Sequence, residues 1–229
     1  MNPKTIASLI DHSLLRPDAT GGDIRRLCEE ALNYGFFSVC VNPCHVGTAK
    51  EILRGSAVKV AAVIGFPLGV TLTEVKVYEA MNADLLGADE LDVVINLGAL
   101  KSGSRDIVRK ELSDIIMVTR DLVHKTIIET CYLTDDEKKV AVEIALQVGS
   151  EFIKTSTGFG RAGARVSDVR LIKRIVGEEA GIKAAGGIRT LREVLAFLDA
   201  GATRIGTSAG VRIIEELSGI KGVEGRRKP

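Results

Sequence analysis

The chain has 229 residues, of which 45% are hydrophobic and 27% are charged, and its formal net charge is +1. These values describe a globular protein with enough apolar residues for a sizeable core. A net charge so close to zero offers no field that would gather nucleic acid or anionic lipid, so we expect neither as a partner. We expect residues 221–229, which include a basic cluster at 226–228, to form a disordered, solvated tail.

The sequence shows no sign of a membrane segment, a signal peptide or a metal site. No apolar run approaches the roughly 18 residues that span a bilayer, and Asp11 interrupts the apolar segment near the start. The cysteines form no C-x-x-C pair. Cys40, Cys44 and His45 are close in sequence, but a zinc site needs four well-spaced ligands and no second cluster follows. We therefore expect apolar core thiols, no metal and a cytoplasmic location.

Eight strands alternate with helical segments along the chain. In chain order, strands are expected at 9–15, within 31–42, at 59–66, within 85–97, at 125–132, and within 145–156, 178–187 and 197–208. In five of these ranges a glycine separates the end of a helix from a strand. This glycine suits the left-handed position that follows a helix, and the strands are rich in valine and isoleucine.

Four helix starts can be recognised between these strands by a hydroxyl residue followed by acids. They are marked by Thr71 with Glu74, Thr134 with the acids at 135–137, Ser167 with Asp168, and Thr190 with Glu193. About eight helices alternating with eight strands, without a linker or a change in composition, indicate one domain over residues 1–229 with parallel strands. At this length we expect a closed (β/α)8 TIM barrel.

A doubly wound open sheet is the alternative architecture. It would place its ligand near a glycine-rich turn after the first strand. Residues 11–20, DHSLLRPDAT, contain no glycine, and the glycine-rich turns lie late in the chain. The barrel is therefore the favoured fold.

Alternation of side chains along a strand predicts which residues share a face. In residues 90–97 the odd positions are all apolar and should face the helices, which leaves Asp92 on the inward face. The same argument directs Lys154 inward with Phe152, and Lys183 inward with Ala185. Each of the three ionisable residues lies near the carboxyl end of its strand, where barrel enzymes place their catalytic groups.

Two explanations fit a buried pair of lysines beside an aspartate. One is a structural network of ion pairs, although two lysines and one carboxylate leave a buried charge of +1. The other is nucleophilic catalysis, since an amine attacks a carbonyl only when it is unprotonated. At about 4 Å and an effective dielectric constant of about 20, two ammonium groups repel by roughly 4 kcal/mol, or about a thousandfold in a protonation equilibrium. We favour the second: one lysine is a neutral nucleophile near pH 7 and the other stays cationic.

Three late turns, at 158–160, 185–187 and 206–210, are rich in glycine. Glycine lets backbone N–H groups approach a phosphate closely, and the helix that follows adds its positive end. Tight-turn geometry explains any single one of these turns equally well. Barrels often bind phosphate after strands seven and eight, so the last two turns together favour a phosphate site. A nucleophilic lysine beside it indicates a class I aldolase that acts on a sugar phosphate.

Over about residues 8–217 the sequence resembles the deoxyribose-phosphate aldolase family. The segments that carry the resemblance are LIDHSLLRPDAT at 9–20, SVCVNP at 38–43, GFPLG at 65–69, ELDVVINLGAL at 90–100, IIETCYLTDDEK at 127–138, EFIKTSTGFG at 151–160, KAAGGIRT at 183–190 and RIGTSAG at 204–210. The resemblance implies a TIM barrel that reversibly cleaves 2-deoxy-D-ribose 5-phosphate into acetaldehyde and D-glyceraldehyde 3-phosphate. It further implies that no metal or cofactor takes part and that the chain forms a homodimer or homotetramer.

The resemblance also implies roles for individual positions. Lys154 would form the Schiff base, Lys183 would perturb it and join the proton network, and Asp92 would relay protons through water. The residues implied to bind the substrate are Asp11, Thr155, Gly158, Gly186, Gly187, Gly206, Thr207 and Ser208. Two departures matter: Phe159 stands where some relatives carry a lysine, and the chain reads GRRKP at 225–229 where some relatives end in a tyrosine.

Two other functions remain open on the sequence. One is a different Schiff-base aldolase of the barrel class, of the transaldolase or keto-acid type, which would use a different donor. The other is a non-catalytic barrel that binds a sugar phosphate and regulates a partner. Such a barrel is expected to have lost the lysine pair, whereas this chain has both lysines.

Overall fold

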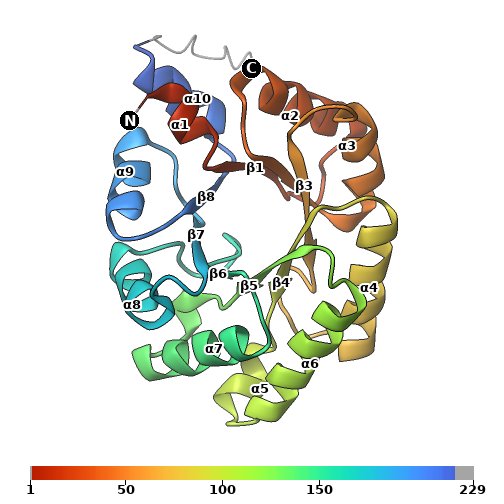
Figure 1. Ribbon diagram of the computed structural model, residues 1–229, viewed down its shortest axis with the longest axis vertical. Coiled ribbons are helices and arrows are strands. Elements are labelled where there is room, and N and C mark those ends of the chain that lie inside the picture. The colour runs from red at the N-terminus through yellow and green to blue at the C-terminus, as the bar shows by residue number, and fades with distance from the viewer. Residues whose placement is uncertain (1, 220–229) are drawn as a thin grey trace.

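The computed structural model describes residues 2–219, which form a closed barrel of eight parallel strands (Figure 1). The strands are β1 (Ile10–Leu14), β2 (Ser38–Val41), β3 (Lys59–Ile64), β4 (Glu90–Val94), β5 (Val123–Ile127), β6 (Phe152–Lys154), β7 (Gly181–Ala185) and β8 (Arg204–Thr207). Strands that are consecutive in sequence are neighbours in the barrel, and β8 pairs with β1 to close it. The expected (β/α)8 barrel is confirmed, and the doubly wound sheet is excluded.

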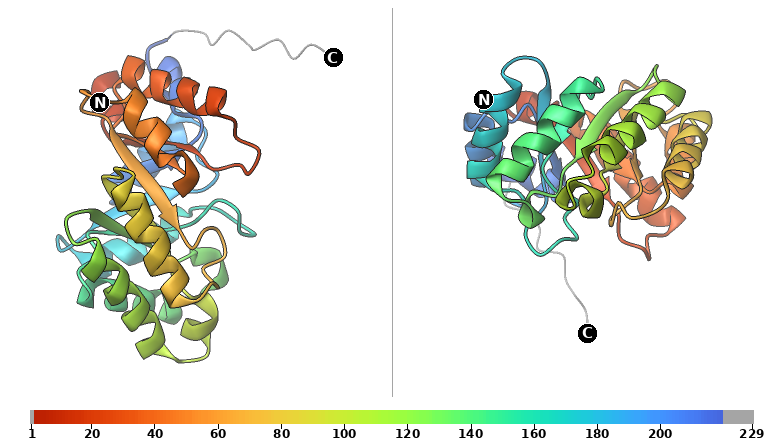
Figure 2. Two further views of the ribbon diagram at one scale, coloured as in Figure 1. Left: turned by 90° about the vertical axis from the view of Figure 1, so that its right-hand side faces the viewer. Right: turned by 90° about the horizontal axis from the view of Figure 1, so that it is seen from below.

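Helices surround the strands on the outside of the barrel, as Figures 1 and 2 show. They are α1 (Pro3–Ala7), α2 (Gly21–Tyr34), α3 (Val46–Ile52), α4 (Thr73–Leu85), α5 (Leu97–Lys101), α6 (Arg105–Val118), α7 (Asp135–Gln147), α8 (Val166–Val176), α9 (Leu191–Asp199) and α10 (Gly210–Leu217), with 3-10 turns η1 (Pro43–His45) and η2 (Thr130–Tyr132). At the two ends of the described chain, α1 and α10 pack against each other. None of the described helices is both long and apolar enough to cross a membrane.

Threonine side chains begin three of these helices with reciprocal capping hydrogen bonds. The three pairs are Thr20 with Asp23 in α2, Thr134 with Glu137 in α7, and Thr190 with Glu193 in α9. The last two were predicted, and the first was not. In each, the threonine accepts the N–H of the acidic residue, whose carboxylate accepts the threonine N–H, so two unpaired donors are satisfied together.

Two of the predicted helix starts are wrong. The cap of α4 is Leu72, one residue after Thr71, and it has no side-chain capping bond. Helix α8 begins at Val166, so Ser167 lies inside its first turn and does not cap it. The predicted acid, Asp168, does lie in that turn. Within it, the Asp168 side chain is buried and bonds Lys138 of α7 at 2.7 Å, which is a tertiary contact that the local pattern cannot reveal.

The two faces of each strand are buried against different partners. Leu91, Val93 and Ile95 belong to the main apolar cluster, which lies between strands and helices. A separate small cluster of Cys40, Ala61 and Val63 lies on the opposite strand face. The alternation predicted for residues 90–97 is therefore confirmed for β4. The expected disordered tail, residues 221–229 with the basic cluster at 226–228, lies outside the described residues.

Candidate active site

Seven charged side chains form one connected set of ion pairs inside the barrel, which we call the interior ion network. Its members are Lys125, Lys154, Lys183, Arg204, Asp11, Glu90 and Asp92. Every member is nearly or fully buried, and each has an oppositely charged partner within 2.8 Å. Four positive and three negative groups leave a formal charge of +1. Such close pairing is required, because an unpaired buried charge is strongly unfavourable.

Asp92 is the centre of the network. Its Oδ2 atom accepts hydrogen bonds from the Nζ atoms of Lys154 and Lys183, both at 2.7 Å, and its Oδ1 atom accepts one from Lys125 at 2.8 Å. Burial alone would disfavour the charge on Asp92. The positive charges of Lys125, Lys154 and Lys183 outweigh burial and hold the pKa of Asp92 well below its usual value. The carboxylate therefore stays ionised.

Lys183 is fully buried between two carboxylates. Its Nζ lies 2.5 Å from Asp11 Oδ2 and 2.7 Å from Asp92 Oδ2. Burial disfavours its charge, but Asp11 and Asp92 more than offset that effect and raise the pKa of Lys183. Lys183 lies directly across from Lys154 in the pairing of β6 with β7. Alternation along the strands predicted that both lysines face the interior, and their shared bond to Asp92 agrees. This environment keeps Lys183 cationic.

A cavity of about 290 Å³, the lysine cavity, opens at the carboxyl ends of β1, β6, β7 and β8. Lys154 is the one member of the interior ion network that lines it. The rest of the lining comes from residues 13–16, 157–159, 185–189 and 206–208. Its position agrees with the usual location of active sites in (β/α)8 barrels.

The structure brings most of the residues expected to contact substrate to this cavity. Six of them line it: Gly158, Gly186, Gly187, Gly206, Thr207 and Ser208. Asp11 lies below the cavity in the network, where it pairs with Lys183 and Arg204. Thr155 does not line the cavity: its hydroxyl donates to the carbonyl of Ala185 and accepts the Ala185 N–H, both at 3.1 Å. It ties β6 to β7.

Two glycines of the late turns have separate physical requirements. Gly187 has a φ of +81°, a backbone conformation that side chains disfavour. At Gly206 an added Cβ would lie 3.0 Å from Cε of Lys183 and 2.9 Å from Cβ of Ala185. Glycine at 206 therefore leaves room for the buried side chain of Lys183. Within residues 2–219, the backbone N–H groups of Gly187 and Ser208 have no hydrogen-bond acceptor, so an anion can use them.

Several charged residues at this site were not predicted from the sequence. Lys125 lies opposite Asp92 in the pairing of β4 with β5, and Arg204 lies opposite Lys183 in the pairing of β7 with β8. Alternation along β5 and β8, together with register, is the signal that would have found them. Arg16 and Arg189 line the lysine cavity from the loops after β1 and β7. Both arginines follow the carboxyl end of a strand closely in sequence, and that position could have indicated that they lie near the site.

The cysteines are free, but they are not all core thiols. Cys28 and Cys40 are buried, whereas Cys131 is half-buried and Cys44 is exposed. The expectation of core positions is therefore wrong for the last two. No group of three or more histidine, cysteine or acidic side chains within residues 2–219 is arranged to hold a metal ion.

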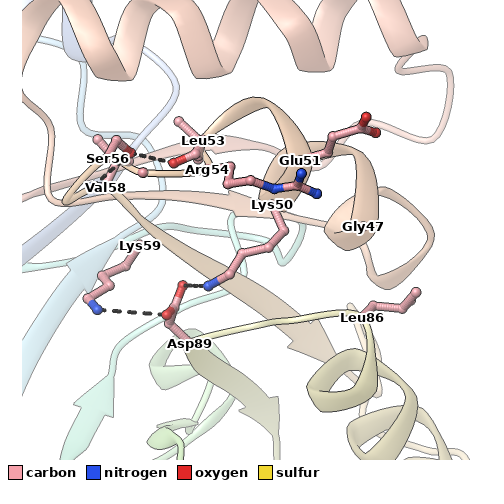
Figure 3. A pocket seen from close by; sticks show the side chains of 11 residues that line it. Gly47, Lys50, Glu51, Leu53, Arg54, Ser56, Val58, Lys59, Leu86 and Asp89 are labelled. Atoms are coloured by element: carbon pink, nitrogen blue, oxygen red, sulfur yellow. Dashed lines mark hydrogen bonds and ion pairs between the residues drawn. The ribbon is translucent and has the colours of Figure 1, made fainter.

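A larger cavity of about 490 Å³ lies at the opposite end of the barrel (Figure 3). Lys50 and Lys59 point toward Asp89, at 2.9 and 3.7 Å, and the same carboxylate accepts the N–H of Val60 at 2.9 Å. Asp89 directly precedes β4, and Lys59 begins β3. This cavity therefore lies at the amino ends of the strands, the face that serves stability in barrels, and not near Lys154.

The fold and the site define a protein of the (β/α)8 barrel class with a buried lysine that lines a cavity at the carboxyl ends of the strands. A family comparison agrees: the model of the DeoC/LacD family aldolases matches residues 5–216, and the chain belongs to this family.

Similar proteins carry consistent names. The chain is 57% identical over 214 residues to the deoxyribose-phosphate aldolase of Thermococcus gammatolerans, covering 92% of this chain and 95% of that protein. It is 52% identical to the deoxyribose-phosphate aldolase of Caldanaerobacter subterraneus subsp. tengcongensis, covering 92% and 93%. Among solved structures, the deoxyribose phosphate aldolase of Aeropyrum pernix, described as a unique tetramer, is 34% identical with a TM-score of 0.90, covering 96% of this chain and 94% of that one.

Proposed function

We propose that the chain catalyses reversible aldol cleavage of 2-deoxy-D-ribose 5-phosphate into acetaldehyde and D-glyceraldehyde 3-phosphate, through a Schiff base on Lys154. One observation carries the proposal: Lys154 is the network member that lines the cavity, so it is the amine that a substrate carbonyl can reach. The names of relatives that are 50–57% identical support the choice of substrate.

Each chemical step can be assigned to a group at the site. The Lys154 amine adds to C1 of the open-chain sugar and loses water to form an imine, which when protonated withdraws electrons from the C2–C3 bond. Removal of the proton from the C3 hydroxyl breaks that bond. The products are glyceraldehyde 3-phosphate and an enamine of acetaldehyde on Lys154. Protonation of the enamine at C2 and hydrolysis of the imine then release acetaldehyde and the amine.

The interior ion network supports this chemistry through its charge. If one of its four cations is neutral, three positive and three negative groups remain and the interior is balanced. Lys154 borders the cavity, so it can exchange a proton with water there, whereas Lys183 is held cationic by two carboxylates. We assign to Asp92 the transfer of protons between Lys183 and the reacting atoms by way of water.

The phosphate group is expected at the glycine-rich side of the lysine cavity. The free N–H groups of Gly187 and Ser208 lie on that side. Arg16 and Arg189 bring positive charge to the same lining, which matters because Phe159 offers no charge of its own. Thr155 is left out of the binding set, since its hydroxyl is engaged by Ala185.

The remaining parts of the proposal follow from the family. We propose that the reaction needs neither metal nor cofactor, because the lysine itself supplies the covalent intermediate. We further propose a homodimer or homotetramer, in line with the tetramer described for the Aeropyrum pernix protein. Four free cysteines are consistent with the reducing cytoplasm that we propose as its location.

Trapping the intermediate tests the assignment of the nucleophile. Borohydride added with acetaldehyde should reduce the imine and leave an ethyl group on Lys154, which peptide mass mapping will locate. Lys154→Leu is the matched control and should carry no ethyl group in the active-site peptide. A label on Lys183 alone would disprove the assignment.

The choice of donor separates this function from its nearest rival. Acetaldehyde should be accepted as the donor, and dihydroxyacetone and pyruvate should not. A clear preference for either of the latter would indicate a transaldolase-like or keto-acid aldolase. No turnover with any donor would favour the non-catalytic barrel.

A further inference from the structure

One fully buried lysine of the interior ion network has no part in the chemistry proposed above. Lys125 has no exposed surface and does not line the lysine cavity. In the pairing of β5 with β6, Lys125 lies opposite Phe152. Ile127, two residues further along the same strand face, lies opposite Lys154. Lys125 is therefore closer to the amino ends of the strands than the nucleophile is, and a substrate in the cavity does not reach it.

The ammonium group of Lys125 holds one oxygen of Asp92. Its Nζ atom donates to Asp92 Oδ1 at 2.8 Å, and the two residues lie directly opposite each other in the pairing of β4 with β5. Lys154 and Lys183 both bond the other oxygen, Oδ2. Within residues 2–219, Lys125 is the only donor to Oδ1.

Neutralising Glu90 is the structural explanation of Lys125. The Nζ atom of Lys125 lies 2.7 Å from Glu90 Oε2. Glu90 has a second cation, however, because a guanidinium nitrogen of Arg204 lies 3.4 Å from the same oxygen. Oδ1 of Asp92 has no such second donor in the described part of the chain. The bond to Asp92 is therefore the contact that only Lys125 supplies.

The contact matters because the other donors to Asp92 change during the reaction. Once Lys154 has become an imine, its nitrogen carries at most one N–H, so its bond to Oδ2 is weakened or lost. Lys183 exchanges protons by way of the same carboxylate. The terminal torsion of an aspartate is soft, so the carboxylate turns unless its other oxygen is held. Lys125 takes no part in the covalent change and stays bonded throughout.

The surroundings of Asp92 and Lys125 keep both groups ionised. Burial raises the pKa of Asp92, and Lys125 is the largest of the effects that lower it well below its ordinary value. Burial lowers the pKa of Lys125, but the nearby carboxylates, chiefly that of Asp92, outweigh burial and raise it. A hydrogen bond between two ionised groups is shorter and roughly twice as strong as one between neutral groups. The hold on Oδ1 is therefore firm.

We propose that Lys125 is a positioning residue for proton transfer: it holds Oδ1 of Asp92, so that Oδ2 stays directed at the reacting atoms near Lys154. This inference rests on the proposed function. The step it serves is proton transfer at C2 of the acetaldehyde adduct. The protonated imine loses a C2 proton by way of water to Asp92, the C–H electron pair becomes the C=C bond, and the C=N pair returns to nitrogen. The reverse step returns a proton to C2 and restores the protonated imine.

The experiment compares two measurements with acetaldehyde alone. Borohydride trapping reports the imine formed on Lys154, and exchange of the methyl protons with D2O, followed by NMR, reports proton transfer at C2. The ratio of exchange to trapped imine removes any change in the protonation of the amine. In Lys125→Met this ratio should fall about 100-fold, as for a catalytic group displaced by about 1 Å. KM for 2-deoxyribose 5-phosphate should stay within about twofold, since Lys125 does not line the cavity.

A double variant separates position from charge. Lys125→Met alone leaves three positive and three negative groups in the interior ion network. Lys125→Met with Glu90→Gln leaves three positive and two negative groups, which is the formal +1 of the parent. Imine formation in the double variant should therefore be close to that of the parent, while the exchange ratio stays about 100-fold lower.

Lys76→Met is the matched control. Lys76 of α4 is also fully buried and pairs with a buried carboxylate, that of Glu111 in α6, at 2.7 Å. Its replacement leaves a buried carboxylate without its cation, so it should lower stability in the same way as Lys125→Met. Because Lys76 does not contact Asp92, the exchange ratio should stay within about twofold of the parent.

Three results would overturn the inference. They are an unchanged ratio in Lys125→Met, a ratio restored in the double variant, and an equal fall in Lys76→Met. The second would limit Lys125 to its charge, and the third would trace the loss to stability. The double variant leaves no network carboxylate without a cation, so it decides the matter if Lys125→Met does not fold. A parent that traps no imine on Lys154 would refute the proposed function instead, so the two failures can be distinguished.

Discussion

A single oxygen atom of Asp92 accepts hydrogen bonds from both lysines of the site. Lys154 and Lys183 each lie 2.7 Å from Oδ2. Repulsion between the two ammonium groups is therefore opposed by an anion between them, and the roughly 4 kcal/mol expected for an isolated pair is an upper limit. What distinguishes the lysines is their surroundings: Lys183 has a second carboxylate, Asp11, whereas Lys154 has the cavity.

Replacing Lys183 by leucine tests whether its charge favours the neutral amine of Lys154. Leucine keeps most of the apolar stem and removes the charge. Single-turnover imine formation with acetaldehyde should fall at least tenfold at pH 7 and recover at higher pH, because removing the neighbouring cation favours the protonated amine. Rapid-quench borohydride trapping across pH 6 to 10 provides the measurement.

Two further variants show whether that pH dependence is specific. Lys154→Leu should form no imine at any pH, because the nucleophile is absent. Asp92→Asn should still form some imine but turn over slowly, since it removes a proton relay and leaves the amine in place. Imine formation at the parental rate in Lys183→Leu at pH 7 would limit Lys183 to proton transfer or structure.

At the scale of elements, β6 is short and ends at the proposed nucleophile. It spans Phe152–Lys154, and the next residue, Thr155, continues the pairing, with its N–H donating to the carbonyl of Lys183 at 3.1 Å. The Thr155 hydroxyl adds two more hydrogen bonds to Ala185. These bonds fix the spacing between the strands that carry the two lysines.

Thr155→Val should therefore lower the free energy of unfolding and leave substrate binding unchanged. Valine has nearly the shape of threonine but leaves two buried backbone groups without their partner, at about 1 to 3 kcal/mol. We expect Tm to fall by several degrees and KM for the phosphorylated sugar to stay within twofold. Thr155→Ser retains the hydroxyl and should recover most of the stability. A large rise in KM with an unchanged Tm would instead indicate that Thr155 contacts the substrate.

A charge placed in the loop after β8 tests the phosphate side of the lysine cavity. Ser208 is exposed and lines the cavity, so Ser208→Asp should fold normally and repel a phosphate. KM for 2-deoxyribose 5-phosphate should rise at least tenfold, or about 1.4 kcal/mol, and that for unphosphorylated deoxyribose should change little. Ser208→Asn, equal in size and uncharged, is the control. Equal effects of the two variants on both sugars would argue against phosphate binding there.

Periodicity explains which parts of the structure the sequence could predict. The recurring pattern of helix, glycine and strand indicates the barrel, because each unit ends a helix at a glycine and continues into an apolar strand. Alternation then places Asp92, Lys154 and Lys183 on inward faces, and the structure finds all three bonded together. Local patterns suffice here because strand direction and side-chain alternation are nearly invariant.

Contacts between distant segments explain what the sequence could not predict. Lys125 joins the network because β5 is in register with β4, and Arg204 joins because β8 lies beside both β7 and β1. Thr155 has the right neighbours in sequence for a binding residue, yet its side chain lies on the strand face opposite that of Lys154. Register and strand order decide the cases of Lys125 and Arg204, and neither is written in a local motif. Alternation along β6 already places Thr155 opposite Lys154, so it argued against the binding role that the family resemblance implied.

At the scale of the whole molecule, the interior ion network links six strands of the barrel. Asp11 comes from β1, Glu90 and Asp92 from β4, and the four cations from β5, β6, β7 and β8, one from each. Burial would raise the pKa of Asp11, but Lys183, Lys125 and Arg204 together hold it below its usual value. The six strands are therefore joined partly by ion pairs, and the protonation of their members depends on pH.

The stability of the barrel should fall in acid because of these carboxylates. The pKa values of Asp11 and Asp92 are lowered in the folded state, so their contribution is complete above the unfolded value of about 3.9 and is lost as pH falls through the folded values. Lys183, whose pKa is raised, contributes below about pH 10.4 and loses that contribution only above it. The urea midpoint should be nearly constant from about pH 7 to 9, and below about pH 6.5 the buried His124, whose pKa burial lowers, begins to reduce stability.

Below about pH 4 the free energy of unfolding should drop by up to about 1.4 kcal/mol per pH unit for each of the two carboxylates. Asp11→Asn should reduce this slope and lower stability at pH 7 by about 3 to 5 kcal/mol, since Lys183 and Arg204 lose a buried partner. Asp199→Asn removes an exposed carboxylate and is the control that should leave the slope unchanged. If Asp11→Asn retains the full acid slope, protonation elsewhere in the protein controls acid unfolding, and the network is not the element that limits stability.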